Sequence, residues 1–142
     1  MKFGSSEYLQ KVKEITNSDE KYANMVKEYN LSYTFIIEAE PNKGVSNEII
    51  IGYKMKDGKM EDIWEGVRET DFVISGKYSV WVDLLTGKMG LTLAFLQRKL
   101  KIRGEFSKIL QLSKATEYWI QMLKKIPTEF EGEFSKYNIG GE

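Results

Sequence analysis

The side chains that most often carry catalysis or bind metals are missing from this chain. Its 142 residues include no cysteine and no histidine. Thiolate nucleophiles, disulfides, thiolate or imidazole metal sites and every triad with a histidine base are therefore excluded. Catalysis would have to depend on Asp, Glu, Lys, Tyr or Ser, and no nucleophile and base can be paired from this set in a standard way. We expect no enzyme, no catalytic residue, no metal site and no cofactor.

Two groups of charged residues remain as candidates for binding an ion. Glu61, Asp62 and Glu65 lie on a predicted hairpin arm, but no glycine pattern of a metal-binding loop accompanies them, so we expect a solvated surface there. In segment 99–103, three cations alternate with two apolar residues. That row could meet a phosphate or an acidic headgroup, although a solvated edge strand is favoured.

The charge balance argues against nucleic acid as a partner. The 21 Lys and Arg residues match the 21 Asp and Glu residues and are mixed with them along the chain, whereas phosphate binding relies on a concentrated cationic face. Segment 1–6 has no apolar signal-peptide region, and no apolar run is long enough for a membrane span. We expect a cytoplasmic protein without a membrane span, and transient contact with a membrane is left open.

Hydrophobic spacing in the first half of the chain predicts helices followed by a sheet. Apolar residues recur at helical spacing from 6 to 29, and Asn17-Ser18-Asp19 interrupts the stripe, which predicts two short helices or one bent helix. Apolar and polar residues then alternate as in half-buried strands. These strands are predicted at 31–40, 47–56 and 59–65. Asp57-Gly58 is a strong signal for a two-residue hairpin between the last two.

The second half of the chain alternates between strand and helix patterns. Strands are predicted at 72–74 and 99–103, and helices at 78–85, 91–96 and about 106–126. Segment 91–96 is uncharged and apolar on nearly its whole circumference, so as a helix it must be covered on most sides, as central core or as a cavity wall. The last and longest helix has an apolar face broader than the stripe of about 100° on an ordinary surface helix. Something beyond the sheet should cover it.

The order of the expected helices and strands, together with four short motifs, resembles that of the sterol carrier protein family. This family is also called the SCP-like or sterol-transfer family. The motifs are TDFVISG at 70–76, LLTGK at 84–88, KLKIRGE at 99–105 and TEF at 128–130. The resemblance extends from about Ser6 to Phe130. Departures occur at Met89-Gly90, where the family often has an acidic residue and a proline, at Arg98, where it often has glycine, and at Glu105, where it often has aspartate.

The resemblance implies an α+β protein with the SCP-like fold. In that fold a mainly antiparallel sheet of about five strands is covered on one face by helices, with N-terminal helices and a long C-terminal helix. No repeat, linker or charge run marks a second domain, so we expect a single domain over residues 1–142, with a core at about 6–130 and a tail at 131–142. Residues 139–142 do not match the peroxisomal tripeptide that commonly ends eukaryotic members. We therefore expect a free-standing, prokaryotic-type member.

The resemblance also implies a hydrophobic tunnel between the sheet and the later helices. The tunnel would hold an apolar lipid-like ligand, such as a fatty acid, an acyl-CoA, a phospholipid, a sterol or an isoprenoid, without catalysis. The residues that we expect in its wall are large, apolar and placed at inward positions: Phe35, Ile37, Ile49, Ile51, Phe72, Ile74, Trp81, Leu85, Phe95, Leu96, Leu100, Trp119 and Leu123. Each of them could instead be plain core, which is the commoner role of an inward apolar residue.

The alternative function is a protein-interaction module. Such a module would form a homodimer, or bind another partner, through the broad apolar face of the final helix. Polar residues at the inward positions would have argued against a lipid tunnel, but those positions are almost uniformly apolar. Lipid binding is therefore the leading hypothesis, and homodimerisation stays open.

Overall fold

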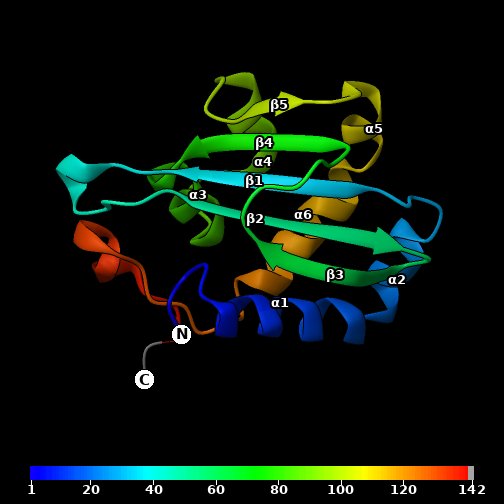
Figure 1. Ribbon diagram of the computed structural model, residues 1–142, viewed down its shortest axis with the longest axis horizontal. Helices are drawn as coiled ribbons and strands as arrows, with labels where there is room; N and C mark the ends of the chain where they lie inside the picture. The colour runs from blue at the N-terminus through cyan, green and yellow to red at the C-terminus, as the bar shows by residue number, and fades with distance from the viewer. Residues whose placement is uncertain (141–142) are drawn as a thin grey trace.

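The structure, a computed structural model that describes residues 1–140, is built on a sheet with the strand order β3-β2-β1-β4-β5 (Figure 1). The strands are β1 (Ser32–Glu38), β2 (Ile49–Lys56), β3 (Lys59–Glu65), β4 (Phe72–Lys77) and β5 (Lys101–Arg103). β1, β2 and β3 form the predicted antiparallel meander, β4 pairs parallel to β1, and β5 pairs antiparallel to β4. The expected mainly antiparallel sheet of about five strands is confirmed.

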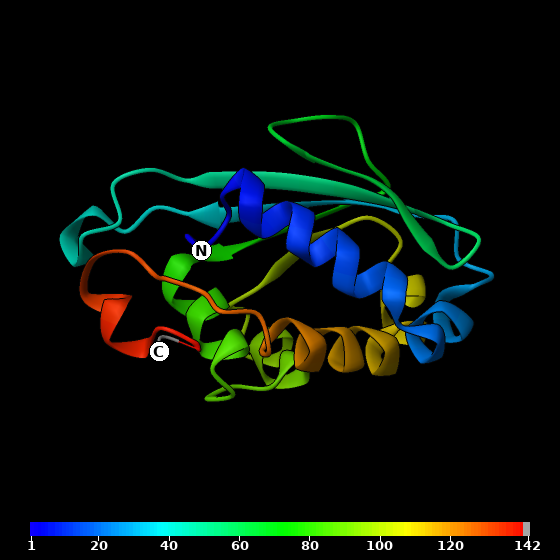
Figure 2. The same ribbon diagram turned by 90° about the horizontal axis from the view of Figure 1, so that it is seen from below.

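The helices form a second layer on one face of this sheet. They are α1 (Ser6–Ser18), α2 (Glu20–Val26), α3 (Tyr78–Leu85), α4 (Leu91–Leu96), α5 (Phe106–Gln111) and α6 (Ser113–Leu123), with 3-10 turns η1 (Pro41–Lys43) and η2 (Gly132–Tyr137). Figure 2 shows the helices beneath the sheet, while the loop between β3 and β4 arches over the opposite face. The structure therefore has the α+β arrangement that the resemblance implies.

Local chemistry explains two of the predicted boundaries. Asp57 and Gly58 have φ values of 51° and 81°, which is the left-handed geometry that a two-residue hairpin requires. Asp19 separates α1 from α2, because its carboxylate accepts a hydrogen bond of 2.8 Å from the N–H of Tyr22 and so caps the second helix. The interrupted stripe near residue 18 thus marks two short helices.

The expected long C-terminal helix is divided in two. α5 ends at Gln111, α6 begins at Ser113, and Leu112 between them has φ −93° and ψ 4°, which lies outside the α-helical range. α6 also ends at Leu123, a few residues before the predicted end near 126. The apolar pattern continues through Leu112 without glycine or proline, so the sequence carries no signal of the break. α6 contacts α1, α2 and α3, and α5 contacts α6.

β4 is longer and β5 is shorter than the spacing predicts. β4 continues through Ser75 and Gly76 because its parallel pairing with β1 extends until Lys77 lies opposite Glu38. β5 covers three residues, which pair with residues 73–75 of β4. The different strand lengths do not change the orientation of the β4 side chains relative to the helices.

Two hydrogen bonds tie α6 to the first helices. The indole N–H of Trp119 donates to Oγ1 of Thr16 at 2.9 Å, and the hydroxyl of Thr16 donates in turn to the carbonyl of Val12 at 2.6 Å. The hydroxyl of Tyr118 donates to the carboxylate of Asp19 at 2.8 Å. Since both Thr16 and Trp119 are buried, the bond between them satisfies a donor that water cannot reach.

The N-terminus and the C-terminal segment close one end of the structure together. Lys2 and Glu129 form a parallel bridge, and Phe130 and Phe134 are buried. The hydroxyl of Tyr78 accepts a hydrogen bond of 3.0 Å from the N–H of Glu131, and burial raises the pKa of Tyr78 to about 12. The described part of the predicted tail therefore packs on the fold, and residues 141–142 of that tail lie outside the described residues.

Replacing Thr16 by valine should destabilise the protein, because the buried indole N–H of Trp119 loses its acceptor. An unsatisfied buried donor costs about 1–3 kcal/mol, and we expect Thr16→Val to lower the free energy of unfolding in urea by that amount. Thr116→Val is the matched control. Thr116 also donates to the carbonyl four residues earlier, at 2.9 Å, but within residues 1–140 it accepts no hydrogen bond. Equal losses in both variants would contradict a special role for the Trp119 bond.

Candidate functional site

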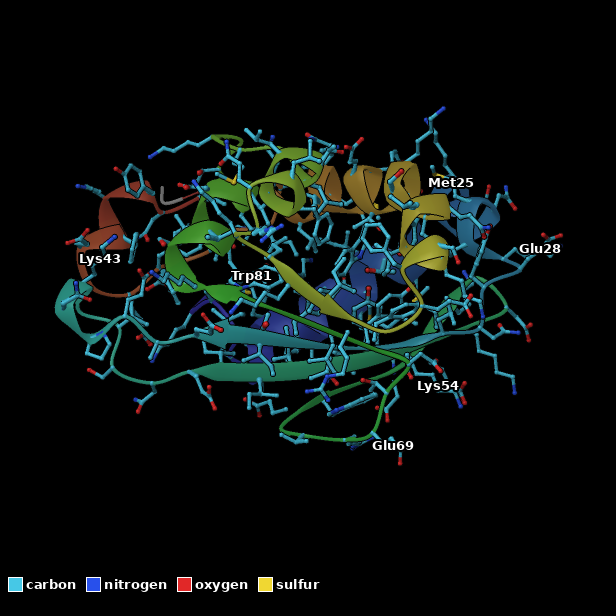
Figure 3. The ribbon with its side chains drawn as sticks, turned by 90° about the horizontal axis from the view of Figure 1, so that it is seen from above. Met25, Glu28, Lys43, Lys54, Glu69 and Trp81 are labelled. Atoms are coloured by element: carbon cyan, nitrogen blue, oxygen red, sulfur yellow. The ribbon has the colours of Figure 1, made fainter. Side chains whose placement is uncertain are left out.

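A cavity of about 190 Å³ lies between the inner face of the sheet and the helix layer. One water molecule needs about 10–15 Å³, so this space is much larger than a packing defect. Its lining comes from β1 to β4 and from α1, α3, α4, α5 and α6. Figure 3 shows Trp81 between the two layers, whereas Lys54 and Glu69 lie on the outer side of the sheet.

The floor of the cavity is set by the period of the strands. Tyr33, Phe35 and Ile37 alternate on β1 and therefore share its inner face. In the register of the sheet, Tyr53 lies opposite Tyr33 and Ile51 lies opposite Phe35. All five side chains line the cavity, so the antiparallel pairing of β1 with β2 makes a continuous apolar floor.

The roof of the cavity comes from helices at both ends of the chain. Its members are mostly large apolar side chains: Tyr8, Leu9 and Val12 of α1, Trp81, Leu84 and Leu85 of α3, Leu91, Phe95 and Leu96 of α4, Phe106, Ile109 and Leu110 of α5, and Trp119, Ile120 and Leu123 of α6. Each helix contributes residues at spacings of one, three or four, as one face of a helix must. The cavity therefore depends on the docking of all five helices.

Phe35 is the centre of an aromatic cluster that joins the floor to the roof. Its ring centroid lies 5.6 Å from that of Tyr53 on the sheet. It also lies 5.4 Å from Trp81 in an edge-to-face arrangement and 6.2 Å from Trp119 in a stacked one. Such aromatic pairs contribute about 0.5–1.5 kcal/mol each beyond the area that they bury. The sheet is thereby fixed to α3 and α6 at a defined spacing.

The lining is uncharged throughout the described residues. Burial raises the pKa of Tyr8 and of Tyr53, and burial together with the nearby Asp71 carboxylate raises the pKa of Tyr33, so these phenols are neutral at physiological pH. The indole N–H of Trp81 is already bonded to the carbonyl of Gly76 at 3.1 Å. The wall consequently offers a ligand a dry apolar surface with few free polar groups.

The cavity opens to solvent at α4 and α5. Leu96, Phe106 and Leu110 line it and are nevertheless 75%, 54% and 58% exposed. Segment 91–96 is therefore less covered than its composition predicts, since Leu93 is exposed as well. At the other end of the chain Phe3, which is buried, also belongs to the lining. The cavity thus has a closed part near the N-terminus and an apolar mouth at α4 and α5.

Eleven of the thirteen expected wall residues line this cavity, and Ile49 and Phe72 do not. Both lie on the inner face of their strands but toward the ends. A Cβ built on Gly4 would lie 2.9 Å from the side chain of Ile49, and one built on Gly104 would lie 2.5 Å from that of Phe72, so backbone loops cover both side chains closely. The period of a strand predicts the face on which a residue lies, but not which loop will cover it.

Sequence reasoning missed several lining residues. Those on α1 (Tyr8, Leu9 and Val12) belong to a predicted apolar stripe, but the expected tunnel lies under the later helices. For Tyr33 and Tyr53 the strand period predicts side chains on the inner face of the sheet, but neither residue is among the expected wall residues. Phe106 and Leu110 belong to the surplus apolar face of the final segment, and that surplus is the signal that could have identified them.

The apolar wall suits enclosure of an apolar molecule. In residues 1–140, no group of three or more carboxylates is placed to hold a metal ion. Over the same residues, no helix has the length and apolar character that would let it cross a membrane. A cavity with an apolar wall favours a ligand that leaves water for hydrophobic reasons alone.

Comparisons with known proteins agree with this geometry. A model of the SCP-2 sterol transfer family matches residues 9–117. A crystal structure of sterol carrier protein 2 superposes with a TM-score of 0.79 at 16% identity, over 88% of this chain and 99% of that chain. A conserved protein of Thermus thermophilus, considered a candidate sterol carrier protein, gives 0.77 at 17% identity, over 87% and 89%. Sterol carrier protein 2 of Aedes aegypti, solved with palmitate, gives 0.57 at 19% identity, over 87% and 100%.

None of the curated protein sequences matches the chain. At the identities above, the likeness to solved structures shows the fold. The family match covers most of the residues from α1 to α6.

The buried tyrosines predict a loss of stability at alkaline pH. Because burial raises the folded-state pKa of Tyr53 above the ordinary value of 10.0, the unfolded chain loses this proton first. The stabilisation is complete below pH 10 and is lost as pH rises above it. In Tyr53→Phe the free energy of unfolding should therefore fall less steeply as pH rises. The difference in slope from the parent protein should approach about 1.4 kcal/mol per pH unit.

Urea unfolding at a series of pH values between about 9 and 11 tests this linkage. Tyr137→Phe is the control: the nearby ammonium groups of Lys88 and Lys136 lower the pKa of Tyr137, so removal of its phenol cannot reduce the decline. A slope that is unchanged in Tyr53→Phe would show that this phenol is not held neutral by the fold.

Proposed function

Since the chain belongs to the SCP-2 sterol transfer family, we propose that it encloses a lipid in its apolar cavity and carries it without converting it chemically. The observation that carries the proposal is the uncharged cavity between sheet and helices, with its apolar mouth at α4 and α5. In this proposal the eleven expected residues that line the cavity form the ligand wall. The cytoplasm is the proposed site of action.

The hydrophobic effect alone supplies enough free energy for such binding. Transfer from water is worth about 0.8 kcal/mol for each buried CH₂. A chain of about sixteen carbons can therefore gain on the order of 10 kcal/mol before the costs of association and of ordering the ligand are subtracted. No polar anchor is required inside the cavity for micromolar affinity.

The narrow, uncharged space between sheet and helices favours a fatty acyl chain as the ligand. A flexible, unbranched chain can follow a narrow space, whereas a rigid sterol ring system needs a wider one. The sterol carrier protein 2 of Aedes aegypti, which shares the fold, is a palmitate complex. We therefore place the acyl chain inside and its polar head at the mouth near Leu96 and Phe106.

Native mass spectrometry of the freshly purified protein is the first test. A carrier with an occupied cavity should show a discrete added mass, and solvent extraction should release a fatty acid or another acyl lipid. A protein that carries no bound ligand after purification and does not bind a fluorescent fatty acid would contradict the proposal. If that protein were a tight dimer, the interaction module would be the better explanation.

Filling the cavity should weaken ligand binding while the fold survives. Thr116 lies on α6 and lines the cavity, so Thr116→Trp places a bulky ring in the space that the acyl chain would occupy. We expect the affinity for a fluorescent fatty acid to fall at least about tenfold, or about 1.4 kcal/mol.

The control for this substitution is Lys114→Trp, two residues earlier on the same helix, where the side chain is exposed and does not line the cavity. Circular dichroism and urea unfolding establish that both variants are folded. If Thr116→Trp and Lys114→Trp bound the fatty acid equally well, the ligand would have to sit elsewhere.

A further inference from the structure

The exposed apolar residues of the protein gather at the mouth of the cavity. In residues 1–140, five large apolar side chains are exposed: Val67, Leu93, Leu96, Phe106 and Leu110. Four of them lie on α4 and α5, and the fifth, Val67, lies in the loop over the outer face of the sheet. An exposed apolar group of this kind usually marks a surface that meets a partner or a membrane.

The same segment also carries an unusual share of the positive charge. Residues 96–110, which we call the basic edge, contain five cations and one anion: Arg98, Lys99, Lys101, Arg103, Lys108 and Glu105. The basic edge therefore has a net charge of +4, and since the whole chain is neutral the rest carries −4. The cations are concentrated on about a tenth of the sequence, although the overall composition conceals this.

Most of these cations are free to meet an outside partner. Lys108 forms an ion pair of 3.9 Å with Glu105. The other four cations of the basic edge are exposed, and none of them forms an ion pair with a carboxylate in the described part of the chain. They have not been neutralised within the fold, so their charge is available for an anionic surface.

The architecture places the segments that carry the cations and the exposed apolar residues along one edge of the molecule (Figure 1). β5 is the outermost strand of the sheet, and Figure 1 shows β5 and α5 along the same edge of the molecule. Lys101 and Arg103 project from β5 with exposed side chains, and the chain continues directly into α5, where Phe106 and Leu110 are exposed. Leu96 precedes β5 at the end of α4.

We propose that the basic edge docks on a bilayer that contains anionic phospholipids. Leu96, Phe106 and Leu110 enter the headgroup region, and the surrounding cations contact phosphate groups. Surfaces that combine apolar side chains with Lys and Arg bind the membrane interface in this way. Because those three apolar residues also line the cavity, docking turns the mouth toward the lipid. Passage of a ligand through that mouth rests on the proposed function, whereas docking itself does not.

Charge reversal at the edge strand tests the electrostatic part. The probes are vesicles of phosphatidylcholine alone and vesicles with equal parts of phosphatidylcholine and phosphatidylglycerol, and binding is measured by flotation. The protein should bind the anionic vesicles, and added salt should weaken this binding. Lys101→Glu with Arg103→Glu should weaken it about 25-fold or more, since each basic residue near the surface is worth about fivefold.

The matched control is Lys27→Glu with Lys56→Glu, which makes the same change in net charge at exposed positions outside the basic edge. It should change vesicle binding about twofold at most, because distant charges are screened by salt. Equal binding to both kinds of vesicle, or an equal loss in the control, would overturn the proposal.

Removal of the apolar side chains tests insertion. Leu96→Ser with Phe106→Ser should weaken binding to the anionic vesicles, whereas Val67→Ser, at an exposed apolar position outside the basic edge, should not. These positions are exposed, so the variants are expected to fold. If sedimentation instead showed a dimer that Leu96→Ser and Phe106→Ser dissociate, the surface would be a protein interface and the membrane proposal would fail.

Fatty acid binding in solution separates this proposal from the proposed function. The variant Lys101→Glu with Arg103→Glu should keep its affinity for a fluorescent fatty acid, because neither residue lines the cavity. Vesicle binding that persists in a protein without any fatty acid affinity would support docking and contradict the carrier function.

Discussion

The contacts of Phe35 with the helix layer are the constraint on which the cavity depends. A sheet with an apolar inner face normally recruits helices that pack closely against it, and the interior then fills. Here the rings of Trp81 and Trp119 meet Phe35 from two different helices. Large rigid rings in edge-to-face and stacked contact cannot shorten their separation without losing that geometry. They therefore hold the layers together and also keep them from collapsing into the space beside them.

The wall of the cavity and its mouth differ in chemical character. The wall is uncharged in the described residues and its indole groups are already hydrogen-bonded, so it can select for apolar character and width but hardly for chemical detail. The cations of the basic edge lie outside this wall. In the proposed function, any preference among lipids with similar chains arises at the mouth, where the headgroup meets water.

The sequence was informative wherever one local rule decided the outcome. Strand period predicted the inner face of β1 and β2, and Asp57-Gly58 predicted the hairpin. The break at Leu112 escaped prediction because no helix-breaking residue marks it. Phe72 escaped for a related reason: its face was predicted correctly, but Gly104 and its backbone cover it. Whether an inward apolar residue faces solid core or empty space depends on contacts between distant elements, which periodicity does not describe.

The hydrogen bond between Thr16 and Trp119 joins residues 103 positions apart, and this separation sets the order in which the molecule can assemble. The meander of β1, β2 and β3 pairs neighbours in sequence and can form early, whereas contacts over long loops form late. During synthesis the apolar face of that meander exists well before α6 leaves the ribosome to cover it. The nascent chain therefore passes through a stage in which the future cavity floor is open to solvent, and this stage is the one most exposed to aggregation.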